Sequence, residues 1–366
     1  MPRCSRLFLA FFAALQGLRA NAQGRMNFPV TVNITSPITL AVDPLCGALS
    51  SENFTEINTG IKTGPTRTIV AFGDSWTSNG ANGTVPVPPI LFPPSPSAGS
   101  QFTENRRASD GFIWVEDMAN ELSAKLLNVR LIVHLISSIA IFIKYDQYAW
   151  GGAIIDNFAY NTTTPLNATG VQRTDFVAET RLFLQQGKFL DALVPDQTLY
   201  VVAFGINDDG QFKIAGGNLT LAYDTYVCSP PSTTTPILRL WVIQVTKLGE
   251  LQASGATNII VQGMYKHTPE IDVLQNQIFA YLRESYIVNG TNFAFVNLER
   301  LFDMIAANPT PFGFKGNATC LISANTIAGG CDDPDHSVFW IPGHPSQNTH
   351  WLIYEYTMAV LEKCII

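Results

Sequence analysis

Short runs of apolar and β-branched residues alternate along this chain with longer stretches in which apolar residues recur every three or four positions. The short runs predict buried strands, and the longer stretches predict amphipathic helices. The predicted strands span residues 68–73, 199–204, 258–262 and 293–298. The predicted helices span residues 112–127, 237–253, 271–286 and 346–361, and a short helix follows the last strand. This alternation favours an α/β domain with a central parallel sheet and helices on both faces.

The first predicted strand ends in Gly73-Asp74-Ser75. A residue at the carboxyl end of a parallel strand lies where α/β sheets usually hold their ligands, so Ser75 is a candidate nucleophile. All three residues are also common turn formers, and the motif alone leaves an ordinary turn as the alternative. We expect Asp74 to stabilise the turn rather than to transfer a proton.

Two distant segments favour the nucleophile. The second predicted strand leads into Gly205 and Asn207, and the Asn207 amide is of the kind that donates hydrogen bonds to an oxyanion. His344 lies between a glycine and a proline just before the last predicted helix. Histidine accepts a serine proton near neutral pH, and a serine early in the chain with a histidine late is typical of α/β hydrolytic enzymes. The Gly-x-Ser-x-Gly elbow is absent, which indicates a different scaffold.

With these residues the sequence resembles the GDSL, or SGNH, hydrolase family, and more narrowly the secreted fungal acetylesterases of carbohydrate esterase family 16. Ser75 lies in a segment similar to the family's nucleophile block, and residues 148–153 are similar to its second block. Residues 205–208 are similar to the third block, and His344-Pro345 to the last. The four segments occur in the family's order, and the resemblance covers roughly residues 66–363.

The resemblance implies a three-layer α/β/α sandwich of the flavodoxin-like type. It also implies that Ser75 attacks an ester, that His344 is the base, and that the Gly152 N–H and the Asn207 amide line an oxyanion hole. No cofactor or metal is expected. The implied substrates are short acyl esters, especially acetyl esters of plant cell-wall oligosaccharides. A lipase for longer acyl chains and a catalytically silent carbohydrate-binding relative are the alternatives.

Ile341 departs from the family pattern, in which an aspartate usually precedes the histidine by three residues and orients it. Asp332, Asp333 and Asp335 lie just upstream, and we interpret them as an ordinary solvated loop. Three possibilities stay open: a Ser–His dyad in which a backbone carbonyl orients the imidazole, a relocated acid, or lost activity.

Residues 129–144 are an atypical, almost wholly apolar insertion between the predicted helix and the second block. The uninterrupted apolar part is too short for a membrane-spanning helix. We hypothesise that the segment is translated from a retained short intron, and sequencing the transcript tests this. If it is genuine, it lies beside the second block and could cap the substrate cleft.

The N-terminus predicts secretion. Two arginines precede an apolar stretch and a small-residue cleavage site, so residues 1–22 are a predicted signal peptide. We expect residues 23–65 to form an extension packed on the esterase domain, which spans residues 66–366. The chain also carries eight sequons, which support an extracellular glycoprotein. Their asparagines are Asn33, Asn53, Asn82, Asn161, Asn167, Asn218, Asn289 and Asn317. No second long apolar run argues for a membrane anchor.

Five cysteines remain after signal removal, and an oxidising compartment favours their pairing. Cys320 and Cys331 bracket a Gly-rich loop and are the pair that we predict; the connectivity of the others is open. Cysteine spacings do not suggest zinc. We expect no contact between His267, which follows a predicted strand, and the substrate.

The net charge of −7, with 22 basic and 29 acidic residues, argues against nucleic acid as a partner, since no Lys/Arg cluster is present to neutralise phosphates. An ester of a small molecule or an oligosaccharide is the expected partner. Trp76, Trp150 and Trp340 neighbour three of the four blocks, where they either stack on sugar rings or pack in the core.

Overall fold

The computed structural model describes residues 37–79, 107–127, 129–136, 140–147, 149–163, 173–187, 193–226, 246–323 and 330–366, with side chains except at 129–147, 186 and 187. The predicted signal peptide, Cys228 and the sequons at Asn33, Asn82 and Asn167 lie outside the described residues.

The central sheet has six strands in the order β1-β8-β7-β6-β2-β3. Strands β2, β3, β6, β7 and β8 are parallel, and the short β1 pairs antiparallel with β8. Their bounds are β1 (Ile57–Asn58), β2 (Thr68–Gly73), β3 (Lys125–Leu127), β6 (Thr198–Ala203), β7 (Asn258–Gln262) and β8 (Asn292–Val296). The four predicted strands are confirmed, and each begins within one residue of its expected start.

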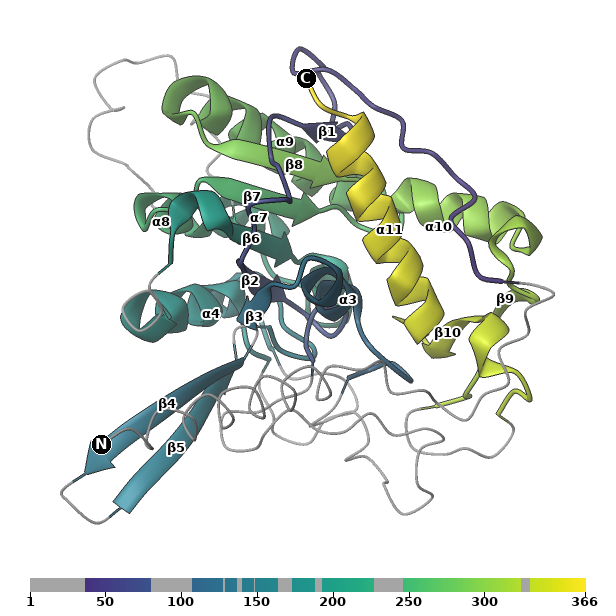
Figure 1. Ribbon diagram of the computed structural model, residues 1–366, viewed down its shortest axis with the longest axis horizontal. Helices are drawn as coiled ribbons and strands as arrows, with labels where there is room; N and C mark the ends of the chain where they lie inside the picture. Colours follow the sequence, from purple (N-terminus) through teal and green to yellow (C-terminus); the bar gives the residue numbers. More distant parts are fainter. Residues whose placement is uncertain are drawn as a thin grey trace, which may run out of the picture. The chain divides into compact units, whose positions relative to one another are not determined.

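Eight α-helices lie in the described part of the chain (Figure 1). They are α3 (Trp114–Glu121), α4 (Phe176–Leu182), α6 (Ile206–Ala215), α7 (Leu219–Tyr226), α8 (Lys247–Ala253), α9 (Pro269–Asn289), α10 (Leu298–Ala307) and α11 (Gln347–Lys363). Of the predicted helix at 237–253, residues 237–245 lie outside the described residues. The sequence explains the bounds of α9: the Thr268 side chain accepts from the Ile271 N–H, Pro269 is the first helical residue, and Gly290 ends the helix in a left-handed conformation.

The helix predicted at 112–127 is wrong in its last part. Helix α3 ends at Glu121, and Ser123 takes a positive φ of 51° that breaks the helix. Residues 125–127 then pair with Thr68, Ile69 and Val70 of β2 as a parallel edge strand. Their apolar spacing suited a helix, but the ladder beside β2 satisfies their backbone groups instead.

The sheet is covered by helices on both faces because its side chains alternate between two cores. Val70 and Phe72 of β2 pack with α4, α7, α8 and α9, whereas Ile69 and Ala71 pack with α3, α10 and α11. Figure 1 shows α4 and α8 to the left of the sheet and α10 and α11 to its right. The expected α/β architecture with a largely parallel central sheet is therefore present.

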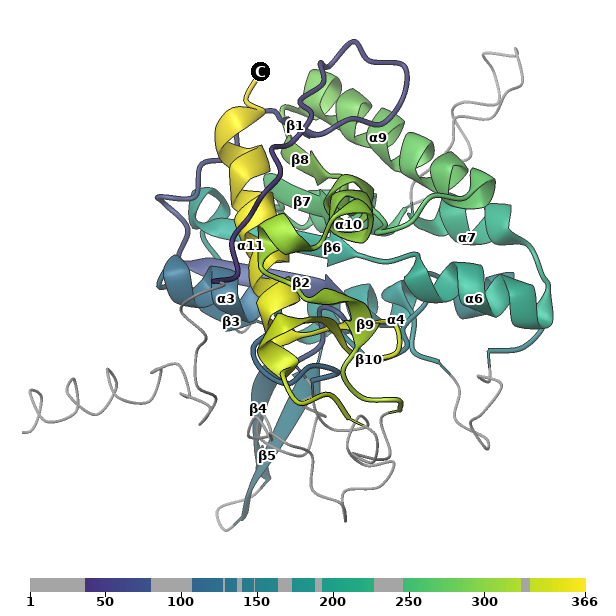
Figure 2. The ribbon, with the colours of Figure 1, turned by 90° about the vertical axis from the view of Figure 1, so that its right-hand side faces the viewer.

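A second, three-stranded sheet precedes the last helix. It has the order β11-β10-β9, with β9 (Gly316–Thr319), β10 (Ser337–Ile341) and β11 (His344–Pro345). The disulfide between Cys320 and Cys331 lies in the connection between β9 and β10, which confirms the predicted pair. Both views place β9 and β10 near the start of α11 (Figures 1 and 2).

The atypical insertion forms a separate antiparallel hairpin of β4 (Val129–Ile136) and β5 (Ala140–Gln147). Val129 pairs with Gln147 at its base, and neither strand joins the six-stranded sheet. Apolar, β-branched residues favour such a ladder when two runs lie side by side. Whether residues 129–144 come from a retained intron is tested by sequencing the transcript, so this hypothesis stays a prediction.

Residues 37–65 contact the domain at several points. Ile57 is fully buried in the core, the Asn58 amide donates to the Leu361 carbonyl oxygen, and a disulfide joins Cys46 to Cys364. Sequence reasoning left this second disulfide open, because its cysteines are 318 residues apart. Among the described residues no helix is both long and apolar enough to cross a membrane.

Candidate active site

Ser75 lies in a tight turn directly after β2. The Asp74 carbonyl oxygen accepts hydrogen bonds from the N–H groups of Thr77 and Ser78, and the Asp74 side chain accepts one from the Trp76 N–H. Asp74 is almost fully buried, which agrees with its expected role in the turn. The turn leaves Ser75 partly accessible while its neighbours on both sides are buried.

The structure brings Ser75 and His344 together across 269 residues of sequence. Ser75 Oγ lies 2.9 Å from Nε2 of His344, which is hydrogen-bonding distance. His344 reaches this position because Pro342 and Gly343 form a two-residue turn between β10 and β11, where Ile341 pairs with His344. Gly343 has a φ of +74°, and a Pro-Gly pair with this conformation is typical of a type II turn.

The other imidazole nitrogen, Nδ1, lies 3.1 Å from the Pro342 carbonyl oxygen. A carbonyl oxygen only accepts hydrogen bonds, so Nδ1 carries the proton in the neutral ring. Nε2 is then the acceptor for the Ser75 hydroxyl. Within one turn, the backbone therefore selects the tautomer that a general base requires.

Among the three possibilities for the missing acid, this geometry matches the dyad oriented by a backbone carbonyl. Ile341 is buried in β10. Asp333 pairs with Lys315 and His336, while the Asp335 backbone oxygen accepts from Asn348. No hydrogen bond between His344 and a carboxylate is present in the described part of the chain.

The second block lies against the end of β2. The Trp150 N–H donates to the Gly73 carbonyl oxygen at 2.9 Å, and the Ala153 N–H closes a turn by donating to the Trp150 carbonyl oxygen. Gly152 has a φ of +81° at the third position of this turn, where a type II turn favours glycine. The Asn207 amide, in the first turn of α6, donates to the Ala153 carbonyl oxygen at 2.9 Å. The second and third blocks are thus joined directly.

Several donors in the linked segments after β2 and β6 remain available for a ligand. The backbone N–H groups of Ser75 and Gly152 have no acceptor among the described residues. The Asn207 amide has two N–H groups, of which one suffices for its bond to Ala153. Such donors can stabilise negative charge that develops on an oxygen.

A layer of charged and polar side chains, most of them buried, supports these donors. Arg173 donates from Nη1 to the Gly152 carbonyl oxygen at 2.9 Å, and Glu179 Oε2 accepts from the Gly73 N–H at 3.1 Å. Asp208 Oδ1 accepts from the Ile155 N–H and from the Tyr160 hydroxyl. These side chains therefore hold the backbone at Gly73, Gly152 and Ile155, next to the available N–H groups.

Burial changes the pKa values in this layer. Desolvation raises the pKa of Asp74 to about 7 and that of Asp208 to about 6, and the nearby Arg173 guanidinium opposes both changes. Desolvation also raises the pKa of Glu179 well above its ordinary value. The sequence analysis missed Arg173 and Glu179, because they lie outside the four blocks and no motif marks them.

The tryptophans have structural roles. Trp76 and Trp340 are 3% and 1% exposed, so for these two the core-packing alternative applies. The Trp76 indole N–H donates to the Gly343 carbonyl oxygen, which ties the turn at Ser75 to the turn at His344. The Trp76 ring also stacks on Tyr265, with centroids 4.6 Å apart. Trp150 is half-buried.

In comparisons with known proteins, no family model matches the chain, and no curated protein matches it.

Proposed function

We propose that this protein is a serine esterase of the GDSL, or SGNH, type. The observation that carries the proposal is the 2.9 Å contact between Ser75 Oγ and His344 Nε2, with the opposite nitrogen held by the Pro342 carbonyl. A hydroxyl is a weak nucleophile until a base removes its proton, and this contact supplies the base. The order of the central strands and the two layers of helices support the three-layer sandwich that the sequence resemblance implies.

The geometry supports a two-step mechanism. His344 Nε2 takes the Ser75 proton as Oγ attacks the ester carbonyl, and the N–H groups of Ser75, Gly152 and Asn207 stabilise the resulting oxyanion. The imidazolium then protonates the departing alkoxide, which leaves an acyl group on Ser75. Water, deprotonated by the same imidazole, attacks this acyl-enzyme and releases the acid.

The substrate class rests on the sequence resemblance, which implies acetyl esters of plant cell-wall oligosaccharides. A series of p-nitrophenyl esters from acetate to palmitate tests it. We expect kcat/KM to be highest for acetate and to fall with chain length. Highest activity on long chains would favour the lipase alternative, and no hydrolysis of any ester would favour the silent carbohydrate-binding relative.

Covalent labelling tests the nucleophile directly. A fluorophosphonate reacts with an activated serine and mimics the tetrahedral intermediate. We expect one adduct per chain, which peptide mass spectrometry places on Ser75. Absence of an adduct, or labelling of another serine, would contradict the assignment.

The pH dependence tests how His344 is oriented. Burial lowers the pKa of His344 below 6.5, and the bond to Pro342 offsets part of this effect. The imidazole must be neutral to act as a base, so kcat/KM should fall on acidification with a midpoint below 6.5. A carboxylate beside the ring would instead raise the pKa, so a midpoint above 6.5 in a profile for p-nitrophenyl acetate would contradict the dyad.

Secretion is part of the proposal. The two disulfides are typical of an oxidising compartment. The five sequon asparagines in the described residues, Asn53, Asn161, Asn218, Asn289 and Asn317, are all exposed. These features support an extracellular glycoprotein, as the predicted signal peptide indicates.

A further inference from the structure

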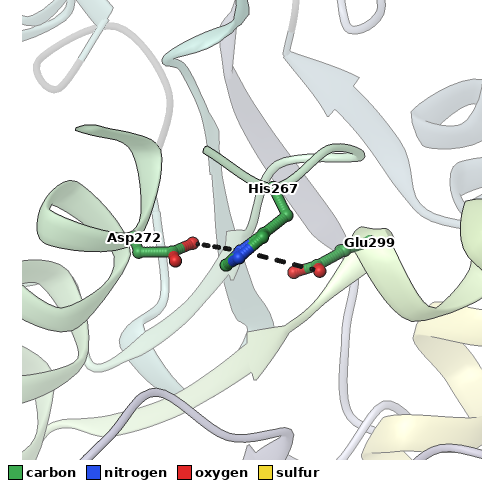
Figure 3. A group of neighbouring side chains, drawn as sticks. All are labelled: His267, Asp272 and Glu299. Atoms are coloured by element: carbon green, nitrogen blue, oxygen red, sulfur yellow. Dashed lines mark hydrogen bonds and ion pairs between the residues drawn. The ribbon is translucent and has the colours of Figure 1, made fainter. Parts of the chain in front are cut away.

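His267 faces two carboxylates that come from two different helices. Its Nδ1 atom lies 2.8 Å from Oδ1 of Asp272 and 3.8 Å from Oε1 of Glu299. One ligand atom from each residue lies within 4.8 Å of the others. Figure 3 shows the imidazole between the two carboxylates, with Asp272 on one helix and Glu299 on the other.

The three residues converge through the topology of the sheet. His267 lies in the connection after β7, Asp272 in the first turn of α9, and Glu299 in the first turn of α10 directly after β8. Strands β7 and β8 are adjacent and parallel, so their carboxyl ends lie at the same edge. The cluster therefore belongs to the edge at which β2 leads into Ser75.

Hydrogen bonds account for part of this cluster: His267 bonds to Asp272, and the Asn297 side chain donates a hydrogen bond to Glu299. Nδ1 of an imidazole carries at most one hydrogen, and a single carboxylate accepts it. Both carboxylates nevertheless face the same nitrogen. Within the described residues, neither Asp272 nor Glu299 forms an ion pair with a lysine or arginine. A cation at this position would satisfy both carboxylates and the ring.

We propose that His267, Asp272 and Glu299 bind a divalent transition-metal ion, for which zinc is the best match. Zinc binds imidazole nitrogen and carboxylate oxygen at about 2.0–2.2 Å, which places tetrahedral ligand atoms about 3.4 Å apart. The distances from His267 Nδ1 to the Asp272 and Glu299 oxygens, 2.8 and 3.8 Å, lie on either side of this value. Two carboxylates neutralise the charge of the ion, and three protein ligands leave a position for water.

The imidazole discriminates among metals. Magnesium and calcium prefer oxygen ligands, whereas zinc and its transition-metal neighbours accept imidazole readily. The His267 side chain is 62% exposed, so the ion reaches the site from solvent without rearrangement of the core.

A bound ion would tie the loop after β7 to α10. Two residues before His267, Tyr265 stacks on Trp76, and Phe302 of α10 contacts both rings. The metal would therefore stabilise the aromatic cluster beside Ser75. This inference concerns metal binding and does not depend on the proposed esterase activity.

Calorimetric titration of zinc into the purified, chelator-treated full-length protein tests the site. We expect one ion per chain. His267→Ala and the double variant Asp272→Asn/Glu299→Gln should weaken binding by at least about 10- to 100-fold, since even the loss of a residue that only orients a ligand costs this much. Glu270→Gln removes an exposed acid from the same turn of α9 and is the matched control, with unchanged binding expected. Zinc binding that is absent, or equally tight in all variants, would overturn the proposal.

A second measurement needs no variant. Diethyl pyrocarbonate modifies accessible neutral imidazoles, and peptide mass spectrometry identifies the histidine that has reacted. We expect His267 to react in the metal-free protein and to lose its reactivity when zinc is added. Magnesium and calcium should give no protection. Undiminished labelling of His267 in zinc, or protection by calcium but not by zinc, would contradict an imidazole-ligated transition metal.

Discussion

Alanine in place of Ser75 or His344 is expected to lower kcat for p-nitrophenyl acetate by about 10⁴- to 10⁶-fold, and the double variant is expected to lose no more than either single variant. In the proposed mechanism the two groups act as a unit, because the hydroxyl is activated only while Nε2 accepts its proton. Once either group is absent, the remaining rate comes from the oxyanion donors and from substrate binding. Additive losses in the double variant would contradict a shared proton transfer.

The same assay separates the dyad from a relocated acid. Asp333→Asn and Asp335→Asn should each keep kcat within about twofold, because these carboxylates have other partners and surface charges contribute little. In a full triad, loss of the orienting acid lowers kcat by about 10⁴-fold. A decrease of about 100-fold or more in kcat for either variant would therefore assign the orienting role to that aspartate. Circular dichroism of each variant verifies that the fold is retained.

Asn207→Ala is expected to lower kcat by about 10²- to 10³-fold with little change in KM, the loss typical of removing one oxyanion donor. The interaction strengthens as charge develops on the carbonyl oxygen, so it affects the transition state more than the bound substrate. Asn207→Asp should be at least as damaging, because a carboxylate cannot donate and repels the oxyanion.

A control addresses the structural bond that Asn207 also makes to Ala153. Asn258→Ala removes another amide donor to a backbone carbonyl, that of Pro195, at the opposite, amino-terminal end of β7. We expect its kcat to equal that of the unmodified protein. An Asn207→Ala variant that raises KM while kcat is retained would contradict a role in the oxyanion hole.

Much of the fold could be predicted because it depends on local pattern. A run such as Ile69–Gly73 has no polar side chain to place in water, so it is buried as a strand of the sheet. The edge strand Lys125–Leu127 could not be predicted, because its backbone partners come from β2, some sixty residues away in the chain. The same applies to the disulfide between Cys46 and Cys364, whose partners meet only in the folded domain.

For the candidate site, the sequence by itself determined which side chains are available: a serine after one strand, an amide after another, and a histidine in a proline-glycine turn. Tertiary structure alone decided what surrounds them. The acceptor for Nδ1 is the Pro342 carbonyl, and every residue carries a carbonyl, so no side-chain pattern identifies it. Arg173 matters because folding places its guanidinium on the Gly152 carbonyl. The local sequence determines which functional groups are present. The orientation of these groups depends on backbone partners that only folding brings within hydrogen-bonding distance.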